Sequence, residues 1–155
     1  MNELYEKSLH TLELDRVLGM LSECCITPEG KERALKLIPT SDAEEVTRLL
    51  QETSDACHMV ELKGNPAFRE VKDVKPSLER ADRGGSLNTV ELLRIAGVLR
   101  ATRGVKAYGE GDGIETGSLD GYFWALTPNR FLEDKITNAI ISEEEIADSA
   151  SPALN

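Results

Sequence analysis

Apolar residues recur every three or four positions along most of this chain, the spacing that places them on one face of an α-helix. In the helix that this pattern predicts over residues 28–38, the side chains of Ala34, Leu35 and Ile38 should point inward. Residues 65–75, which lie around Pro66 and before Pro76, are irregular and leave room only for a short extended piece. We therefore expect an all-α fold, a compact multi-helix array with short capped loops and no substantial sheet. The predicted helices cover residues 11–25, 28–38, 41–64, 76–83, 88–108, 119–126 and 128–141.

Helix start and stop signals support these boundaries. The segments 41–44 (Ser-Asp-Ala-Glu) and 88–91 (Asn-Thr-Val-Glu) have the capping-box pattern, in which a polar side chain caps one backbone N–H and a glutamate reaches back to another. Thr27-Pro28 and Thr127-Pro128 each place a hydroxyl cap before a proline at the first helical position. Gly64 is a natural stop for the third helix.

Two segments depart from the helical pattern. Residues 109–121 are rich in glycine and predict a flexible loop. Residues 142–155 begin with an acidic stretch and end in Ser151-Pro152-Ala153-Leu154, which has the composition of a helix start. We interpret 142–155 as a connector to a further helix downstream, and residues 1–155 as a helical core segment of a longer protein.

Composition narrows the class of protein. The 155 residues are 40% hydrophobic and 30% charged but only 5% aromatic, which is typical of one globular domain with an aliphatic core. The count of 18 Lys and Arg against 28 Asp and Glu gives a net charge of −10. A body with this charge has no general attraction for a polyphosphate, so nucleic-acid binding would need a local basic patch.

A local basic patch exists on the helix predicted over 88–108. Arg100 and Arg103 are three positions apart and share a face, which makes them candidates for contact with phosphate. Solvated cations near the C-terminus of a helix, where the helix dipole favours them, fit the same pattern, and no aromatic residues interleave to stack on bases. The cationic window as a whole contains Arg80, Arg83, Arg94, Arg100, Arg103 and Lys106.

Targeting signals and cysteine usage favour the cytoplasm. The first residues lack the basic and apolar regions of a secretory signal, and no apolar run approaches the roughly 20 residues of a membrane span. The three cysteines, Cys24, Cys25 and Cys57, are odd in number and have no C-x-x-C spacing, as in a reducing compartment. We expect a cytoplasmic protein that does not contact a membrane.

No motif predicts a catalytic, cofactor-binding or metal-binding residue in this chain. Residues 104–109 have the glycine spacing of a phosphate-binding loop, but Glu110 and Gly111 stand where that loop needs lysine and a hydroxyl. A calcium loop starting at Asp112 would place Ile114 at a ligand position. His10 and His58 have no partner at the spacing of a helical metal pair, although His58 follows Cys57 directly.

Three stretches resemble the endonuclease branch of the bacterial MutS family, whose members lack the mismatch-reading domain. They are residues 12–18 with 27–33, residues 76–85 followed by Leu87 and 91–93, and residues 126–154, in which the string 148–154 is the most specific. The resemblance covers nearly the whole chain. The glycine-rich region 109–121 departs from the family pattern.

The resemblance implies a non-catalytic scaffold within a much larger machine. Full-length members are dimeric ATP-driven clamps with a split helical core, lever helices, an ATPase domain that uses ATP and Mg²⁺, and usually a C-terminal nuclease domain. The family is associated with binding branched DNA, suppressing recombination and, in some bacteria, splitting collided ribosomes, a role that involves rRNA. None of the family's nucleotide-binding or nuclease residues maps onto this chain.

Two other functions are compatible with the same residues. The chain could be a free-standing helical adaptor that binds another protein through an apolar groove, which a stop codon after Asn155 would favour. It could also be a small hydrolase with Glu110 and Asp112 in its site, which would require loss of activity on their substitution.

Overall fold

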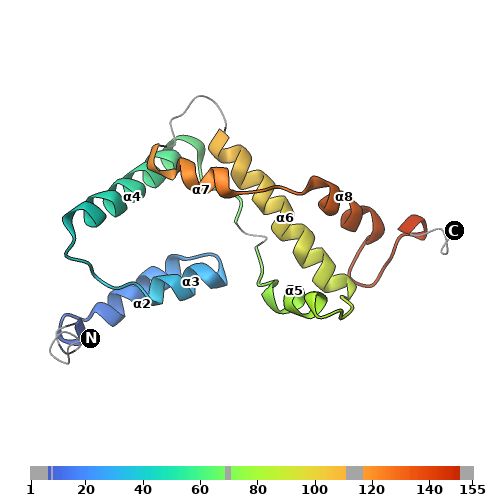
Figure 1. Ribbon diagram of the computed structural model, residues 1–155, viewed down its shortest axis with the longest axis horizontal. Coiled ribbons are helices and arrows are strands. Elements are labelled where there is room, and N and C mark those ends of the chain that lie inside the picture. Colours follow the sequence, from blue (N-terminus) through green and yellow to red (C-terminus); the bar gives the residue numbers. More distant parts are fainter. Residues whose placement is uncertain (1–6, 8, 69–70, 111–116, 151–155) are drawn as a thin grey trace. The chain divides into compact units, whose positions relative to one another are not determined.

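The computed structural model describes residues 7, 9–68, 71–110 and 117–150 (Figure 1). Contacts divide the chain into two compact units, Met1–Ser41 and Asp42–Asn155, which we describe separately. Over the described ranges the chain forms helices, and its extended pairing is an isolated antiparallel bridge between Ile140 and Ile146. The prediction of an all-α fold is confirmed. The helices are α2 (Leu14–Cys24), α3 (Pro28–Leu35), α4 (Ala43–Lys63), α5 (Lys75–Asp82), α6 (Thr89–Glu110), α7 (Asp120–Ala125) and α8 (Arg130–Ala139), with 3-10 turns η1 (Gly117–Leu119) and η2 (Asp148–Ala150).

In the first unit the short helices α2 and α3 are in mutual contact. Thr27 caps α3 as predicted, because its Oγ1 accepts a hydrogen bond of 3.0 Å from the Gly30 N–H and Pro28 occupies the first turn. Ala34 is buried, but the prediction that Leu35 and Ile38 also point inward is wrong. The helix ends at Leu35, so Ile38 lies beyond it, and both side chains are exposed.

The helix α4 opens the second unit, and its cap differs from the prediction. Asp42, rather than Ser41, is the N-cap, and its Oδ1 accepts hydrogen bonds from the Glu44 and Glu45 N–H groups at 2.9 and 3.3 Å. A carboxylate at a helix N-terminus also gains from the helix dipole. The predicted end is confirmed, since Gly64 has φ +75° and its N–H donates to the Val60 carbonyl.

The core of the second unit lies between α6 and α8 (Figure 1). Ile95 and Ala96 of α6 pack with Ile136 and with Ile140, which directly follows α8. The capping box at the start of α6 is confirmed in both directions, because the Glu91 N–H donates to Asn88 Oδ1 and the Asn88 N–H donates to Glu91 Oε2, each at 2.9 Å. The partly buried residues packed on this core are Val74, Leu87, Leu92, Leu93, Leu99 and Ala139.

The region predicted as a flexible loop over 109–121 is helical at both of its ends. Residues 109 and 110 complete α6, and residues 117–121 form η1 and the start of α7, while residues 111–116 lie outside the described part. Asp55 of α4 holds η1, because its Oδ2 accepts hydrogen bonds from the Ser118 N–H at 2.9 Å and the Ser118 hydroxyl at 2.7 Å. Phe123 of α7 packs on Tyr108 with ring centroids 6.4 Å apart.

The predicted cap of α8 is wrong. The helix begins at Arg130, and Asn129 is its N-cap, with Oδ1 accepting a 3.0 Å hydrogen bond from the Leu132 N–H. Thr127-Pro128 therefore lies before the cap, because the asparagine two residues on offers an equally good acceptor. The chain then turns back along the bridge between Ile140 and Ile146 and reaches η2. The helix start predicted at residues 151–154 lies outside the described residues.

Candidate interaction surface on α6 and α8

The two arginines predicted to contact phosphate meet a buried carboxylate. Glu133 of α8 is only 5% exposed, and its two oxygens accept hydrogen bonds from Arg103 Nε at 3.0 Å and Arg103 Nη2 at 2.8 Å. Arg100 Nε lies 3.6 Å from Glu133 Oε1. The structure thus brings Arg100 and Arg103 together on one face of α6, as predicted, and gives them a common partner.

The ion pairs of this cluster shift the pKa values of Glu133 and Arg103. The bidentate hydrogen bonds from Arg103 lower the pKa of Glu133 below its ordinary value, and the positive charges of Arg103 and Arg100 act in the same direction against the effect of burial. The same carboxylate raises the pKa of Arg103. The side chains of Arg100 and Arg103 are about half exposed.

Three of the other cations of the predicted basic window, Arg80, Arg83 and Lys106, are also engaged within the protein. Arg80 pairs with Glu91, and Arg83 Nε donates to the Glu79 carbonyl at 3.0 Å. Lys106 Nζ donates to the Leu126 carbonyl at 2.9 Å, which ties α6 to the segment between α7 and α8. The contacts of Arg80 and Lys106 thus join separate elements, whereas that of Arg83 lies at the end of α5.

Sequence reasoning did not single out Glu133, although a signal was present. Glu133 precedes the core residue Ile136 by three positions, so the two side chains lie on the same face of α8. A charged residue on the buried face of a helix requires a partner of opposite charge nearby.

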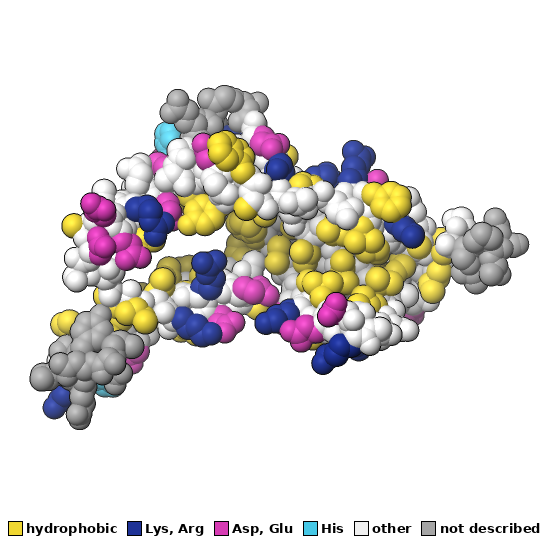
Figure 2. Space-filling view, viewed as in Figure 1, with side chains coloured by type: hydrophobic (Ala, Val, Ile, Leu, Met, Phe, Trp, Pro, Cys, Tyr) yellow, Lys and Arg dark blue, Asp and Glu magenta, His cyan; other side chains and the backbone are white. Residues whose placement is uncertain are grey.

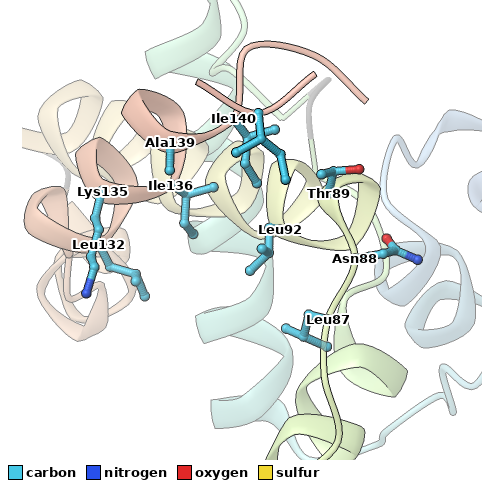
Figure 3. Close-up of a pocket in the computed structure, with 10 residues that line it drawn as sticks. Leu87, Asn88, Thr89, Leu92, Leu132, Lys135, Ile136, Ala139 and Ile140 are labelled. Atoms are coloured by element: carbon cyan, nitrogen blue, oxygen red, sulfur yellow. The ribbon is translucent and has the colours of Figure 1, made fainter. Parts of the chain in front are cut away.

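An apolar groove of ≈ 620 Å³ lies beside the core, between the start of α6 and α8 (Figure 3). Its aliphatic lining residues include Leu132 and Ile146, which are 37% and 53% exposed. Figure 2 shows hydrophobic side chains gathered between α5, α6 and α8 on the viewed face. The lining residues are Leu87, Asn88, Thr89, Leu92, Leu132, Lys135, Ile136, Ala139, Ile140 and Ile146.

Two polar residues of this groove form side-chain hydrogen bonds within the protein. Asn88 Oδ1 caps α6, and the Thr89 hydroxyl donates to the Glu143 carbonyl. Lys135 is the charged residue among those that line the groove. A small polar ligand needs several convergent donors and acceptors, whereas this lining favours an apolar occupant.

The residues considered for metal or nucleophilic chemistry are not among those that line this groove. The described residues contain no group of three His, Cys, Asp or Glu side chains that could hold a metal ion. Cys24, Cys25 and Cys57 are free thiols. Glu110 lies at the end of α6, 3.8 Å from Lys106, and Asp112 is outside the described part. Among the helices described, none is both long and apolar enough to cross a membrane.

Comparison with known proteins gives a consistent set of relatives. No protein-family model matches the chain. It is 41% identical over 152 residues to the endonuclease MutS2 of Ruminiclostridium cellulolyticum, which is 97% of this chain and 19% of that protein. The proteins of the same name from Acetivibrio thermocellus and Agathobacter rectalis are 40% and 42% identical, each over 96% of this chain and 19% of their own length. The chain therefore spans about a fifth of the length of the curated relatives it matches.

Proposed function

Because this chain is a relative of the MutS2 endonucleases, as its motifs indicated, we propose that it is a non-catalytic helical scaffold segment of a MutS-type DNA-repair protein. The proposal depends on the lengths of the matched regions. The match includes 97% of this chain but only 19% of the R. cellulolyticum protein. The activity in the relatives' name is then supplied by other parts of the longer protein.

The internal contacts of the second unit fit a scaffold that transmits motion. Separate helices are joined by charged or hydrogen-bonded links rather than by apolar contact alone. Lys63 Nζ at the end of α4 donates to the Tyr108 carbonyl of α6, and the Tyr108 hydroxyl donates to the Gly64 carbonyl, both at 2.9 Å. With the link from Asp55 to Ser118 and the cluster around Glu133, these contacts make α4, α6 and α8 parts of one framework.

The longer protein would carry the remaining properties of the family. We propose that it is a cytoplasmic homodimer that uses ATP and Mg²⁺, cuts DNA, binds branched DNA and suppresses homologous recombination. Splitting of collided ribosomes through rRNA contacts belongs to the same proposal. This segment would be its mechanical support, in contact with domains that follow it.

A comparison of the chain with the full-length protein tests the proposal. We expect purified residues 1–155 to hydrolyse no ATP and to leave branched DNA uncut, while the full-length protein does both in the presence of Mg²⁺. Phosphate release by residues 1–155 above a blank, after removal of contaminating ATPases, would refute the scaffold role.

The apolar groove favours one alternative, a free-standing adaptor that binds a helix of another protein. Reading the gene beyond Asn155 separates the two functions. A long helical stretch followed by a phosphate-binding loop motif supports the scaffold, and a stop codon supports the adaptor.

Contact between phosphate and the pair Arg100 and Arg103 stays a prediction that a binding assay can decide. We expect the double variant R100A/R103A of the full-length protein to bind branched DNA more weakly and with a smaller dependence on salt. Glu133→Gln is the matched variant, because it disturbs the same cluster while keeping both arginines. Equal weakening in both variants would assign the effect to structure rather than to phosphate contact.

A further inference from the structure

Two free thiols lie on neighbouring residues at the point where α2 ends. Cys24 is the last residue of α2, and Cys25 is its C-cap, with an extended backbone at φ −78° and ψ 134°. Cys24 is exposed and Cys25 is half-buried, and neither forms a disulfide. This arrangement gives the first unit two adjacent sulfur nucleophiles with access to solvent.

The side chain of Cys25 is free to turn toward Cys24. Its S–H donates a 3.4 Å hydrogen bond to the Leu21 carbonyl. A thiol is a weak donor, so rotation of the Cys25 side chain away from this carbonyl costs little. Gly30 of α3 faces Cys25, and a Cβ at residue 30 would lie 3.9 Å from the sulfur. Because glycine has no side chain, the space beside this sulfur stays open for an incoming atom.

A disulfide between the two neighbours is unfavourable. A trans peptide bond joins Cys24 and Cys25, so their Cα atoms are about 3.8 Å apart. The Cα atoms of ordinary disulfides are roughly 4.4–6.8 Å apart, so a direct S–S bond would strain the backbone here. A further atom placed between the two sulfurs enlarges the ring and removes this strain. The pair is therefore better suited to share one soft atom than to form a bond of its own.

We propose that Cys24 and Cys25 form a dithiol site for trivalent arsenic, which reaches it as an organic arsenic(III) oxide. Thiolate sulfur is a soft ligand and prefers soft, polarisable centres. In the reaction R–As=O + 2 R′–SH → R–As(S–R′)2 + H2O, the As=O bond breaks, two As–S bonds form, and both thiol protons leave with the oxygen as water. Arsenic stays trivalent and sulfur is not oxidised, so the step needs no oxidant or reductant.

The number of ligands favours arsenic over a metal ion of higher coordination. Two sulfurs and one organic substituent complete the three bonds of trivalent arsenic, whereas a structural zinc site needs four ligands. Within the described ranges no three His, Cys, Asp or Glu side chains are grouped so as to hold a metal ion. The inference goes beyond the scaffold role and shares no residue with it.

Protection of the thiols by phenylarsine oxide tests the proposal in the native full-length protein. The protein is incubated with phenylarsine oxide, alkylated with N-ethylmaleimide and digested with trypsin. The tryptic peptide 17–31 then reports Cys24 and Cys25, and the peptide 49–63 reports Cys57. Cys57 is the internal control, because it is also a free thiol and has no cysteine beside it.

We expect phenylarsine oxide to protect both thiols of peptide 17–31 at a concentration about tenfold or more below that needed for Cys57. The second As–S bond forms within one molecule, at a high effective concentration of thiol. The single variants Cys24→Ser and Cys25→Ser should each lose this advantage, so the remaining thiol should need about tenfold or more reagent, as Cys57 does. The dithiol 2,3-dimercaptopropanol should restore alkylation, and the same concentration of the monothiol 2-mercaptoethanol should not.

Three results would overturn the site. They are protection of Cys57 at the same concentration as the pair, full protection in either single serine variant, and full alkylation of peptide 17–31 at every concentration of the arsenical. Each readout comes from thiol alkylation and none from ATP hydrolysis or DNA cleavage, so the dithiol site and the scaffold role fail separately.

Discussion

Glu133 is a carboxylate on the face of α8 that also carries the core residue Ile136. Burial of an unpaired charge is strongly unfavourable, so the ion pair with Arg103 is a condition for this packing rather than an addition to it. The two N–H···O contacts are charge-assisted and parallel, which makes the pair directional as well as attractive.

The substitution Glu133→Gln should destabilise the chain at pH 7. The amide fills the same volume but loses charge-assisted hydrogen bonds, which we expect to lower the free energy of unfolding by about 1–3 kcal/mol. Urea unfolding followed by circular dichroism measures the change. Glu144→Gln, at an exposed carboxylate on the turn after α8, is the control and should change little.

The effect of E133Q should also depend on pH in a defined direction. The folded-state pKa of Glu133 is lowered, so the unfolded state binds more protons as the pH falls through the ordinary glutamate value of about 4.3. The stabilisation is therefore complete above that value and is lost as the pH falls through the folded-state pKa. The difference between wild type and E133Q should shrink on acidification, and a constant difference would contradict this account.

The partnership itself was not predictable from the sequence. The spacing of Arg100 and Arg103 placed them correctly on one face, because helical periodicity is a local property. The helix that lies opposite this face is determined by the packing of α6 against α8, which no local sequence pattern predicts. Glu133 could therefore be recognised as unusual but not assigned to Arg103.

At the scale of elements, the docking of α7 on α6 includes a close approach of backbone to an aromatic ring. Gly109 lies directly against the ring of Phe123, so a side chain at residue 109 would overlap that ring. The adjacent contact of Phe123 with Tyr108 completes the docking. Gly109 thus allows two helices to pack closely, although the glycine content of residues 109–121 predicted a loop.

Gly109→Ala should destabilise the docking of α7. The added methyl forces the ring of Phe123 to move, which we expect to lower the free energy of unfolding by about 1–3 kcal/mol. Gly121→Ala is the matched control on α7, where an added Cβ meets no atom within 4 Å. Alanine there should stabilise the helix by up to about 1 kcal/mol. Denaturation monitored by the fluorescence of Trp124 distinguishes the two, and equal stability of G109A and wild type would exclude this role for Gly109.

Helices were the predictable part of the structure, and their caps were predictable only in part. The Asn88–Glu91 box and the Thr27 cap form as expected, whereas Asp42 and Asn129 replace the expected Ser41 and Thr127. In each failure a second good acceptor stands one or two residues after the first. Intrinsic preferences of Ser, Thr, Asp and Asn at this position are too similar to separate such neighbours.

At the scale of the whole molecule, the two units differ in how much apolar surface they bury. The described residues of the first unit bury only Ala34, and α2 has no buried residue. The second unit buries residues on α4, α6 and α8. A unit of about 40 residues with so small a core has little stability of its own.

Hydrogen exchange should therefore separate the two units. We expect the amides of α2 and α3 to exchange through low-energy local opening, and those of α6 and α8 to exchange much more slowly, near the limit set by global unfolding. Mass spectrometry of the intact chain, digested after labelling, makes the comparison on one sample. Equal protection of α2 and α6 would show that the first unit is stabilised by more than the contacts described for it.

The planar fork between Arg103 and Glu133 has a mechanical consequence. Both N–H···O distances depend on the rotation of α6 and α8 about their axes as well as on their separation, so a slip of one helix along the other breaks both at once. The fork therefore opposes any sliding of α8 along α6, because a slip would break its two hydrogen bonds together.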